Sequence, residues 1–135
     1  MDLRYLACLF LAGLLAGCAT APKTPQRLAW VTGLKPEKAA YYKELHAHPW
    51  PSVMKQLKAC HVQNYSIFKR EIDGNLYLFS YLEYTGNDFD ADMKKMAADA
   101  TTQRWWKATD PCQYPVATAK PGDKWKTMEE VFHMD

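Results

Sequence analysis

Tyr42 and His46 have the types and spacing that could move a proton. They lie four residues apart in the segment "YYKELH", so on a helix a phenol and an imidazole project from one face. An imidazole with an ordinary pKa of about 6.5 can accept or donate a proton close to neutral pH. Acid/base catalysis at a bound substrate is one interpretation of His46. A hydrogen-bonded or surface histidine is the other, because a single histidine on a helix is usually structural.

Three aromatic residues elsewhere in the chain could line a binding site. Tyr65 lies in the strand-like segment "QNYSIF", on the face opposite to Asn64 and Ser66. Trp105 and Trp106 are adjacent, and neighbouring side chains on a helix point about 100° apart, so both indoles cannot enter the same core. Aromatic rings beside a pocket often stack on the apolar face of a sugar. The alternatives are a core or interface role for Tyr65, and one core and one dimer-contact tryptophan.

The composition and the motifs argue against several other classes of protein. The 135 residues carry 17 Lys and Arg against 15 Asp and Glu, without a basic stripe, so nucleic-acid binding is not supported. No glycine-rich phosphate loop, G-x-S-x-G elbow or paired-cysteine motif occurs in the sequence. His46 and His48 are two residues apart rather than four, which does not favour a zinc site.

The pattern of the chain predicts the elements that must position these residues. Strands are expected at 27–34, 61–70, 75–84 and 127–134, and helices at 36–60, with a break near "HPWP", at 88–99 and at 101–109. Asp73-Gly74 is the dipeptide of a two-residue hairpin turn, and Asn87 is a suitable helix cap. The order β-α-β-β-α-β predicts one α+β domain of the ferredoxin-like type, with helices on one face of an antiparallel sheet.

The first eighteen residues differ from the rest of the chain. Arg4 in a short polar start, an apolar run over 5–16 and small residues before Cys18 predict a secretory signal that is too short for a comfortable membrane span. Residues 15–18, "LAGC", resemble the bacterial lipobox, which implies cleavage before Cys18 and lipidation of that residue. An ordinary cleaved signal with an incidental cysteine is the alternative.

These features predict a signal peptide at 1–17, a tether at 18–26 and a domain at 27–135. By resemblance to bacterial lipoproteins, Ala19 after the cysteine favours a lipid-anchored location on the periplasmic side of the outer membrane. Cys60 and Cys112 would then lie in an oxidising compartment. A disulfide between them and two unpaired thiols both remain open, because spacing does not establish geometry.

Six short blocks together resemble the L-rhamnose mutarotase family. From about Arg27 to Met134, an opening strand is followed by "YYKELH", "PWP", "QNYSIF", "LYLFSYLEY", "QRWWK" and "EEVFHM", in the family's order and at similar spacing. The resemblance implies a ferredoxin-like domain of the dimeric α+β barrel type, which dimerises through its sheet. It also implies a mutarotase that interconverts the α and β anomers of a 6-deoxyhexose, with no metal or organic cofactor.

By this resemblance His46 matches the catalytic histidine, and Tyr42, Tyr65, Trp105 and Trp106 match substrate-binding residues. The segment "TDPCQYPVATAKPGDKW" and the lipobox depart from the family pattern. They leave the sugar open between L-rhamnose, L-fucose and the end of an oligosaccharide. A non-catalytic sugar-binding periplasmic lipoprotein is the alternative function, and a small dimeric oxygenase is a third.

Overall fold

A computed structural model describes residues 24–134 of the chain. The predicted signal peptide at 1–17, the predicted lipidation site Cys18 and most of the predicted tether lie outside the described residues.

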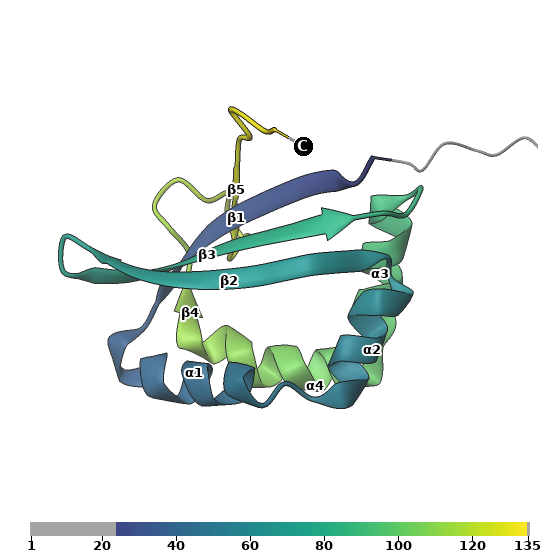
Figure 1. Cartoon of the computed structure of the whole chain (residues 1–135). Coiled ribbons are helices and arrows are strands. Elements are labelled where there is room, and N and C mark those ends of the chain that lie inside the picture. The colour runs from purple at the N-terminus through teal and green to yellow at the C-terminus, as the bar shows by residue number, and fades with distance from the viewer. Residues whose placement is uncertain (1–23, 135) are drawn as a thin grey trace, which may run out of the picture.

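An antiparallel sheet runs across one side of the molecule (Figure 1). Its strands are β1 (Gln26–Leu34), β2 (Val62–Ile72), β3 (Asn75–Tyr84), β4 (Gln113–Tyr114) and β5 (Lys126–Met128). Their order is β2-β3-β1-β4, and β5 also pairs with β1. Two short strands, β4 and β5, therefore occupy the place that a single fourth strand has in a ferredoxin-like sheet. β4 pairs at the end of β1 and β5 pairs near its middle.

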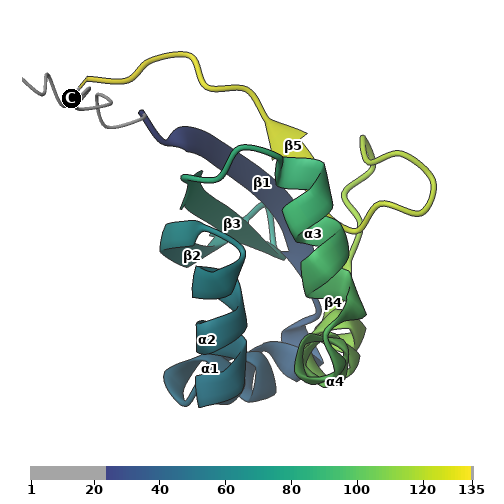
Figure 2. The same cartoon turned by 90° about the vertical axis from the view of Figure 1, so that its right-hand side faces the viewer.

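Four helices lie on one face of this sheet (Figure 2). They are α1 (Ala39–Ala47), α2 (Pro51–Ala59), α3 (Phe89–Ala98) and α4 (Ala100–Thr109), and short 3-10 turns at Pro36–Lys38 and Asp110–Cys112 precede α1 and follow α4. Pro51 occupies the first turn of α2 and restarts the helix after the predicted break at "HPWP". The predicted ferredoxin-like α+β fold is confirmed.

The core lies between the sheet and the helices. Leu78, Ser80, Leu82 and Tyr84 of β3 are buried and alternate with less buried residues, as the period of a strand requires. Cys60 belongs to one buried cluster, packed under α2 and α3, and Cys112 belongs to a second cluster near α1. Both cysteines are free thiols, so of the two alternatives the structure has unpaired thiols and not a disulfide between Cys60 and Cys112.

The predicted hairpin turn is confirmed at Asp73-Gly74. Both residues have positive φ, 51° and 76°, as the two central residues of a type I′ turn require. The start of α3 differs from the prediction. The cap of α3 is Asp88 rather than Asn87, because the Asp88 carboxylate accepts a hydrogen bond from the backbone N–H of Ala91.

The predicted strand at 127–134 is wrong beyond Met128. Pairing with β1 ends at Met128, and the following residues are held by a side chain instead. The Arg27 guanidinium donates two hydrogen bonds to the Glu130 carboxylate, at 2.7 and 3.0 Å. Val131, Phe132 and Met134 are exposed beyond this ion pair.

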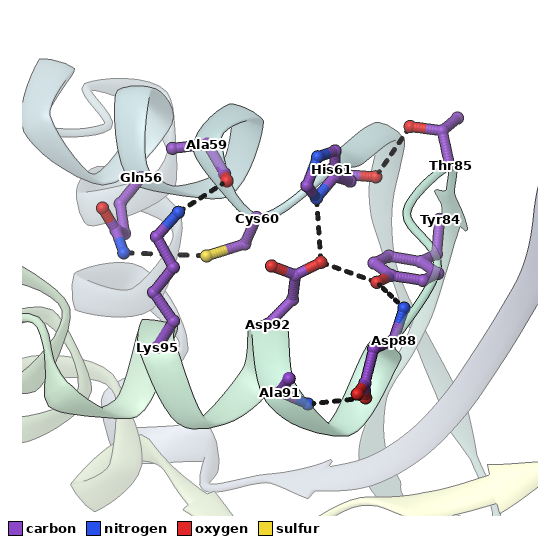
Figure 3. Close-up of polar contacts among 10 residues, drawn as sticks. All are labelled: Gln56, Ala59, Cys60, His61, Tyr84, Thr85, Asp88, Ala91, Asp92 and Lys95. Atoms are coloured by element: carbon purple, nitrogen blue, oxygen red, sulfur yellow. Dashed lines mark hydrogen bonds and ion pairs between the residues drawn. The ribbon is translucent and has the colours of Figure 1, made fainter.

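A hydrogen-bonded group ties α3 to the turn between α2 and β2; we call it the Asp92 cluster (Figure 3). The Tyr84 hydroxyl donates to Asp92 Oδ2 at 2.6 Å, and His61 Nδ1 lies 2.8 Å from the same oxygen. The hydrogen bond from Tyr84, followed by that from His61, holds the pKa of Asp92 below its ordinary value, because both stabilise the carboxylate.

Asp92→Asn should destabilise the fold at neutral pH, and its cost should shrink as the solution is acidified. A carboxyl group whose pKa is lower in the folded state contributes stability above its unfolded pKa of about 3.9, and that stability is lost as pH falls through the folded value. The measurement is the urea midpoint of both proteins at pH 7, 5, 4 and 3. Asp90→Asn, in the exposed first turn of the same helix, is the control. A cost of Asp92→Asn that does not change with pH would contradict this linkage.

Candidate active site

His46 lies in the last turn of α1, where the sequence ends the helix just before Pro49. Its Nδ1 is 2.9 Å from the backbone carbonyl oxygen of Tyr42, one turn earlier. A carbonyl oxygen can only accept a hydrogen bond, so Nδ1 must carry the proton. In the neutral ring, Nε2 therefore keeps its lone pair and can act as a base.

Two aromatic rings hold the imidazole of His46 in place. The Tyr42 ring stacks on it, with ring centroids 4.1 Å apart and an angle of 27° between the planes. The Trp105 indole meets it edge to face at 5.1 Å, and Trp50 in turn meets Trp105 edge to face at 5.2 Å. Contacts of this kind fix the orientation of a ring as well as its position. The predicted pair of Tyr42 and His46 is thus one rigid unit.

The pKa values around His46 suit proton transfer. Burial lowers the pKa of His46 below its ordinary value, so the ring is neutral at neutral pH. Burial, followed by the proximity of Tyr65, raises the pKa of Tyr42. Burial raises the pKa of Tyr65 to about 12, although the residue as a whole is 44% exposed. Both phenols therefore stay protonated and can donate hydrogen bonds.

A bulge in β2 allows Tyr65 to face the helices. Pairing with β3 shifts by one residue between Gln63 and Ser66, and Asn64 takes a left-handed conformation with φ of 47°. Val62 and Tyr65 are three residues apart and would lie on opposite faces of a regular strand. With the extra residue, both line the same side of the sheet beneath α2. Asn64 suits this position, because asparagine tolerates positive φ better than most residues.

The structure brings all five predicted residues of the domain to one cavity of about 230 Å³. We call this the polar cavity, and it lies between β2, α1, α4 and the segment that follows α4. Its lining residues are Tyr42, His46, Tyr65, Ile67, Trp105, Trp106, Thr109, Asp110, Gln113 and Trp125. Trp105 is buried, whereas Trp106 is half-buried. Both indoles thus reach one cavity, although Trp105 also packs in the interior.

Gln113 is one of the residues of the polar cavity that the sequence did not predict, and its chemistry points to a ligand. Its side chain is buried, yet among the described residues its Oε1 has no hydrogen-bond partner. A buried acceptor without a partner is costly unless a ligand supplies a donor. The side chain also acts on the Tyr42 hydroxyl, where it opposes the rise in pKa. No motif surrounds Gln113 in the sequence, and only its position beside the cavity reveals it.

The described part of the chain has neither a metal-binding cluster nor a membrane-spanning helix. Within residues 24–134, no group of three or more His, Cys, Asp or Glu side chains is arranged to hold a metal ion. Over the same range, no helix combines the length and the apolar character that crossing a bilayer requires.

Fold and cavity together define a ferredoxin-like α+β domain with a neutral histidine in a pocket of aromatic rings and hydrogen-bonding groups. The family model "L-rhamnose mutarotase" matches residues 27–134. The chain belongs to the L-rhamnose mutarotase family, and it is an isomerase that acts on the anomeric centre of a monosaccharide.

Three similar proteins support this assignment. The chain is 33% identical to an L-rhamnose mutarotase of Bacillus subtilis and 30% identical to one of Oceanobacillus iheyensis. Each match covers 82% of this chain and 99% of the relative. The crystal structure of an L-rhamnose mutarotase from Formosa agariphila superposes with a TM-score of 0.61 and 27% identity, over 82% of this chain and 99% of that one.

The comparison corrects the predicted location. Three of the curated relatives are matched over 98 to 99% of their own length, and the family match in this chain begins only at residue 27. Nearly the whole of each relative therefore corresponds to the domain, and no segment of it corresponds to the predicted signal peptide and tether. The location predicted from the sequence, on the periplasmic side of the bacterial outer membrane through a lipid anchor, is wrong.

Proposed function

We propose that the protein interconverts the α and β anomers of L-rhamnose, with His46 as the acid/base and the polar cavity as the sugar site. The arrangement at His46 carries this proposal. A fixed Nδ1–H, a lowered pKa and a lone pair on Nε2 make a base that is ready at neutral pH. The substrate is inferred from the relatives, which are named L-rhamnose mutarotases.

The reaction needs one proton to move between two oxygens of the same carbon. Nε2 of His46 accepts the proton of the C1 hydroxyl, and the imidazolium returns it to the ring oxygen as the bond between C1 and that oxygen breaks. The open-chain aldehyde turns about the bond between C1 and C2, and the reverse steps close the ring on its other face. Both oxygens are bonded to C1, so a single nitrogen can serve both.

The remaining groups of the polar cavity would hold the sugar. The hydroxyls of Tyr42 and Tyr65 can donate to sugar oxygens, and Gln113 Oε1 can accept from a sugar hydroxyl. Trp105 and Trp106 offer apolar surface for a sugar face and for the C6 methyl group of a 6-deoxyhexose. The cavity thus offers donors, an acceptor and apolar walls, which a sugar ring requires together.

Saturation-transfer NMR of anomeric exchange tests the proposal. We expect the protein to exchange L-rhamnose faster than buffer alone, and faster than it exchanges D-glucose, which has a polar C6. L-fucose is included as the other 6-deoxyhexose. Absence of accelerated exchange for all three sugars would overturn the proposal and leave only the non-catalytic sugar-binding alternative, which family membership does not favour.

We further propose that the protein is a homodimer that pairs through the outer face of its sheet. All four helices lie on the opposite face. On the outer face, Phe79 lies between Phe68 and Val31 on the neighbouring strands, and Tyr81 lies next to Ala29. Phe68 is 62% exposed. An apolar sheet face of this kind is typical of a surface that a partner covers.

Phe68→Glu should weaken the dimer by about 30-fold or more in dissociation constant, as expected for a buried aromatic at the centre of an interface. Sedimentation velocity over a concentration series measures this. Tyr41→Glu is the matched control, because Tyr41 is an aromatic residue of similar exposure on the helical side. A monomeric wild-type protein, or equal dissociation of both variants, would contradict pairing through the sheet.

A further inference from the structure

A second cavity of about 500 Å³ opens beside the polar cavity. We call it the annex. The two cavities share four wall residues, which are His46, Tyr65, Ile67 and Trp105. The rest of the annex is lined by Pro49, α2 and the start of β2. The annex is about twice as large as the polar cavity, and the proposed reaction of an unsubstituted sugar gives it no role.

The walls of the annex are mostly apolar. They include Val53, Met54 and Leu57 of α2, Val62 of β2, and Pro49 just before α2. Val53 and Val62 are buried, whereas Met54 is 42% exposed at the opening. This lining contrasts with the polar cavity, where hydroxyl, amide and carboxylate groups are present.

The polar residues of the annex have little capacity for a ligand. The amides of Gln63 and Asn64 both donate to the Glu83 carboxylate, at 2.9 and 2.7 Å. Lys58 contributes an exposed ammonium group at the edge. A second sugar unit would bring several hydroxyls to walls that are mostly aliphatic, where few polar groups are available to pair with them, and unpaired polar groups are costly to bury. An alkyl or acyl group would instead be stabilised by the aliphatic walls.

We propose that the annex binds an apolar group attached through oxygen to the sugar. The substrate class would then be a reducing 6-deoxyhexose that carries an alkyl or acyl substituent on a hydroxyl other than that at C1. This inference rests on the proposed function, because His46 is part of both cavities and places the reacting carbon where they meet. The anomeric hydroxyl stays free, so the proton transfer is unchanged.

The test compares L-rhamnose with its 2-O-, 3-O- and 4-O-propyl ethers. Ethers are used because they neither hydrolyse nor migrate. Anomeric exchange gives KM and kcat, and ligand-observed NMR titration gives a dissociation constant that does not depend on catalysis. We expect at least one ether to bind roughly 60-fold more tightly than L-rhamnose, the gain from burying three carbon groups.

Met54→Trp should abolish this gain and leave the exchange of L-rhamnose unchanged. Met54 lines the annex but not the polar cavity, and its exposure leaves room for a larger ring without disturbing the core. Lys55→Trp is the matched control, because Lys55 is exposed on the same helix and lines neither cavity. The control should keep the full gain.

Two results would overturn the inference. One is tighter binding by none of the three ethers, and the other is a gain that Met54→Trp does not reduce. If L-rhamnose still exchanges in either case, the proposed function stands and only the annex assignment fails. If no sugar exchanges but an ether binds in a manner that Met54→Trp abolishes, the annex assignment stands and the proposed function fails.

Discussion

His46→Ala should lower the rate of catalysed anomeric exchange of L-rhamnose by about 10²- to 10⁴-fold, the usual contribution of a general acid/base. The substitution removes the Nε2 lone pair, which the hydrogen bond of Nδ1 to the Tyr42 carbonyl keeps available in the wild-type protein. The neighbouring rings stay in place, because Trp105 is also supported by Trp50. Binding of the sugar should therefore change much less than the rate. Saturation-transfer NMR of exchange and a separate titration of binding measure the two effects.

His48→Ala is the matched control for this experiment. His48 lies two residues further along, is exposed, and has its Nε2 3.6 Å from the Glu44 carboxylate. Its loss should leave exchange unchanged. A His46→Ala variant that keeps the wild-type rate would show that another group moves the proton.

The pH dependence of the exchange rate is a second test of the role of His46. A general base works in its neutral form, and burial lowers the pKa of His46 below its ordinary value of about 6.5. The wild-type rate should thus stay high as pH falls to that value and decrease only at lower pH. The residual rate of His46→Ala should lack this decrease.

Gln113→Met should weaken binding of L-rhamnose by about tenfold or more and should leave the stability of the fold nearly unchanged. In the free protein, Oε1 of Gln113 is buried without a partner among the described residues, which costs stability. Methionine has nearly the same shape and no such acceptor, but it also lacks the amide that hydrogen-bonds the Tyr42 hydroxyl. The two effects oppose each other, so the free energy of unfolding should change by less than about 1 kcal/mol. The bound sugar, in contrast, loses the acceptor for one of its hydroxyls.

The two measurements for Gln113→Met are an NMR titration with L-rhamnose and a urea unfolding curve. Gln113→Glu keeps an acceptor oxygen at the same position and should retain more of the affinity than the methionine variant. Unchanged affinity together with lower stability would mean that Gln113 serves only the fold. Its proposed role in holding the sugar would then be wrong.

Local patterns in the sequence were sufficient to predict most of the fold. The strand-like segments at 61–70 and 75–84 predicted β2 and β3, and Asp73-Gly74 predicted the hairpin turn between them. Prolines predicted the break between α1 and α2. The end of the chain was mispredicted, because a segment rich in apolar residues is a strand only where a neighbouring edge pairs with it. Beyond Met128 that pairing gives way to the Arg27 to Glu130 ion pair.

The candidate site was predictable only in part. The i, i+4 spacing placed Tyr42 and His46 together, because a helix converts sequence distance directly into proximity. Gln113 could not be found in this way, since its importance depends on a missing hydrogen-bond partner in three dimensions. The bulge at Asn64 has no reliable local signal either. The location was mispredicted because it was read from the composition of the first eighteen residues, which says nothing about the domain's relatives.

The loop between the two short strands β4 and β5 can change in sequence and length without changing the rest of the fold. β4 and β5 each pair with β1, and the chain between them, residues 115–125, ends at Trp125 on the wall of the polar cavity. Insertions and deletions in a surface loop that is anchored at both ends cost the fold little. His46, in contrast, stands on a helix. The architecture therefore favours evolvability, because changes in the loop could alter the proposed sugar site while the proposed proton transfer at His46 is retained.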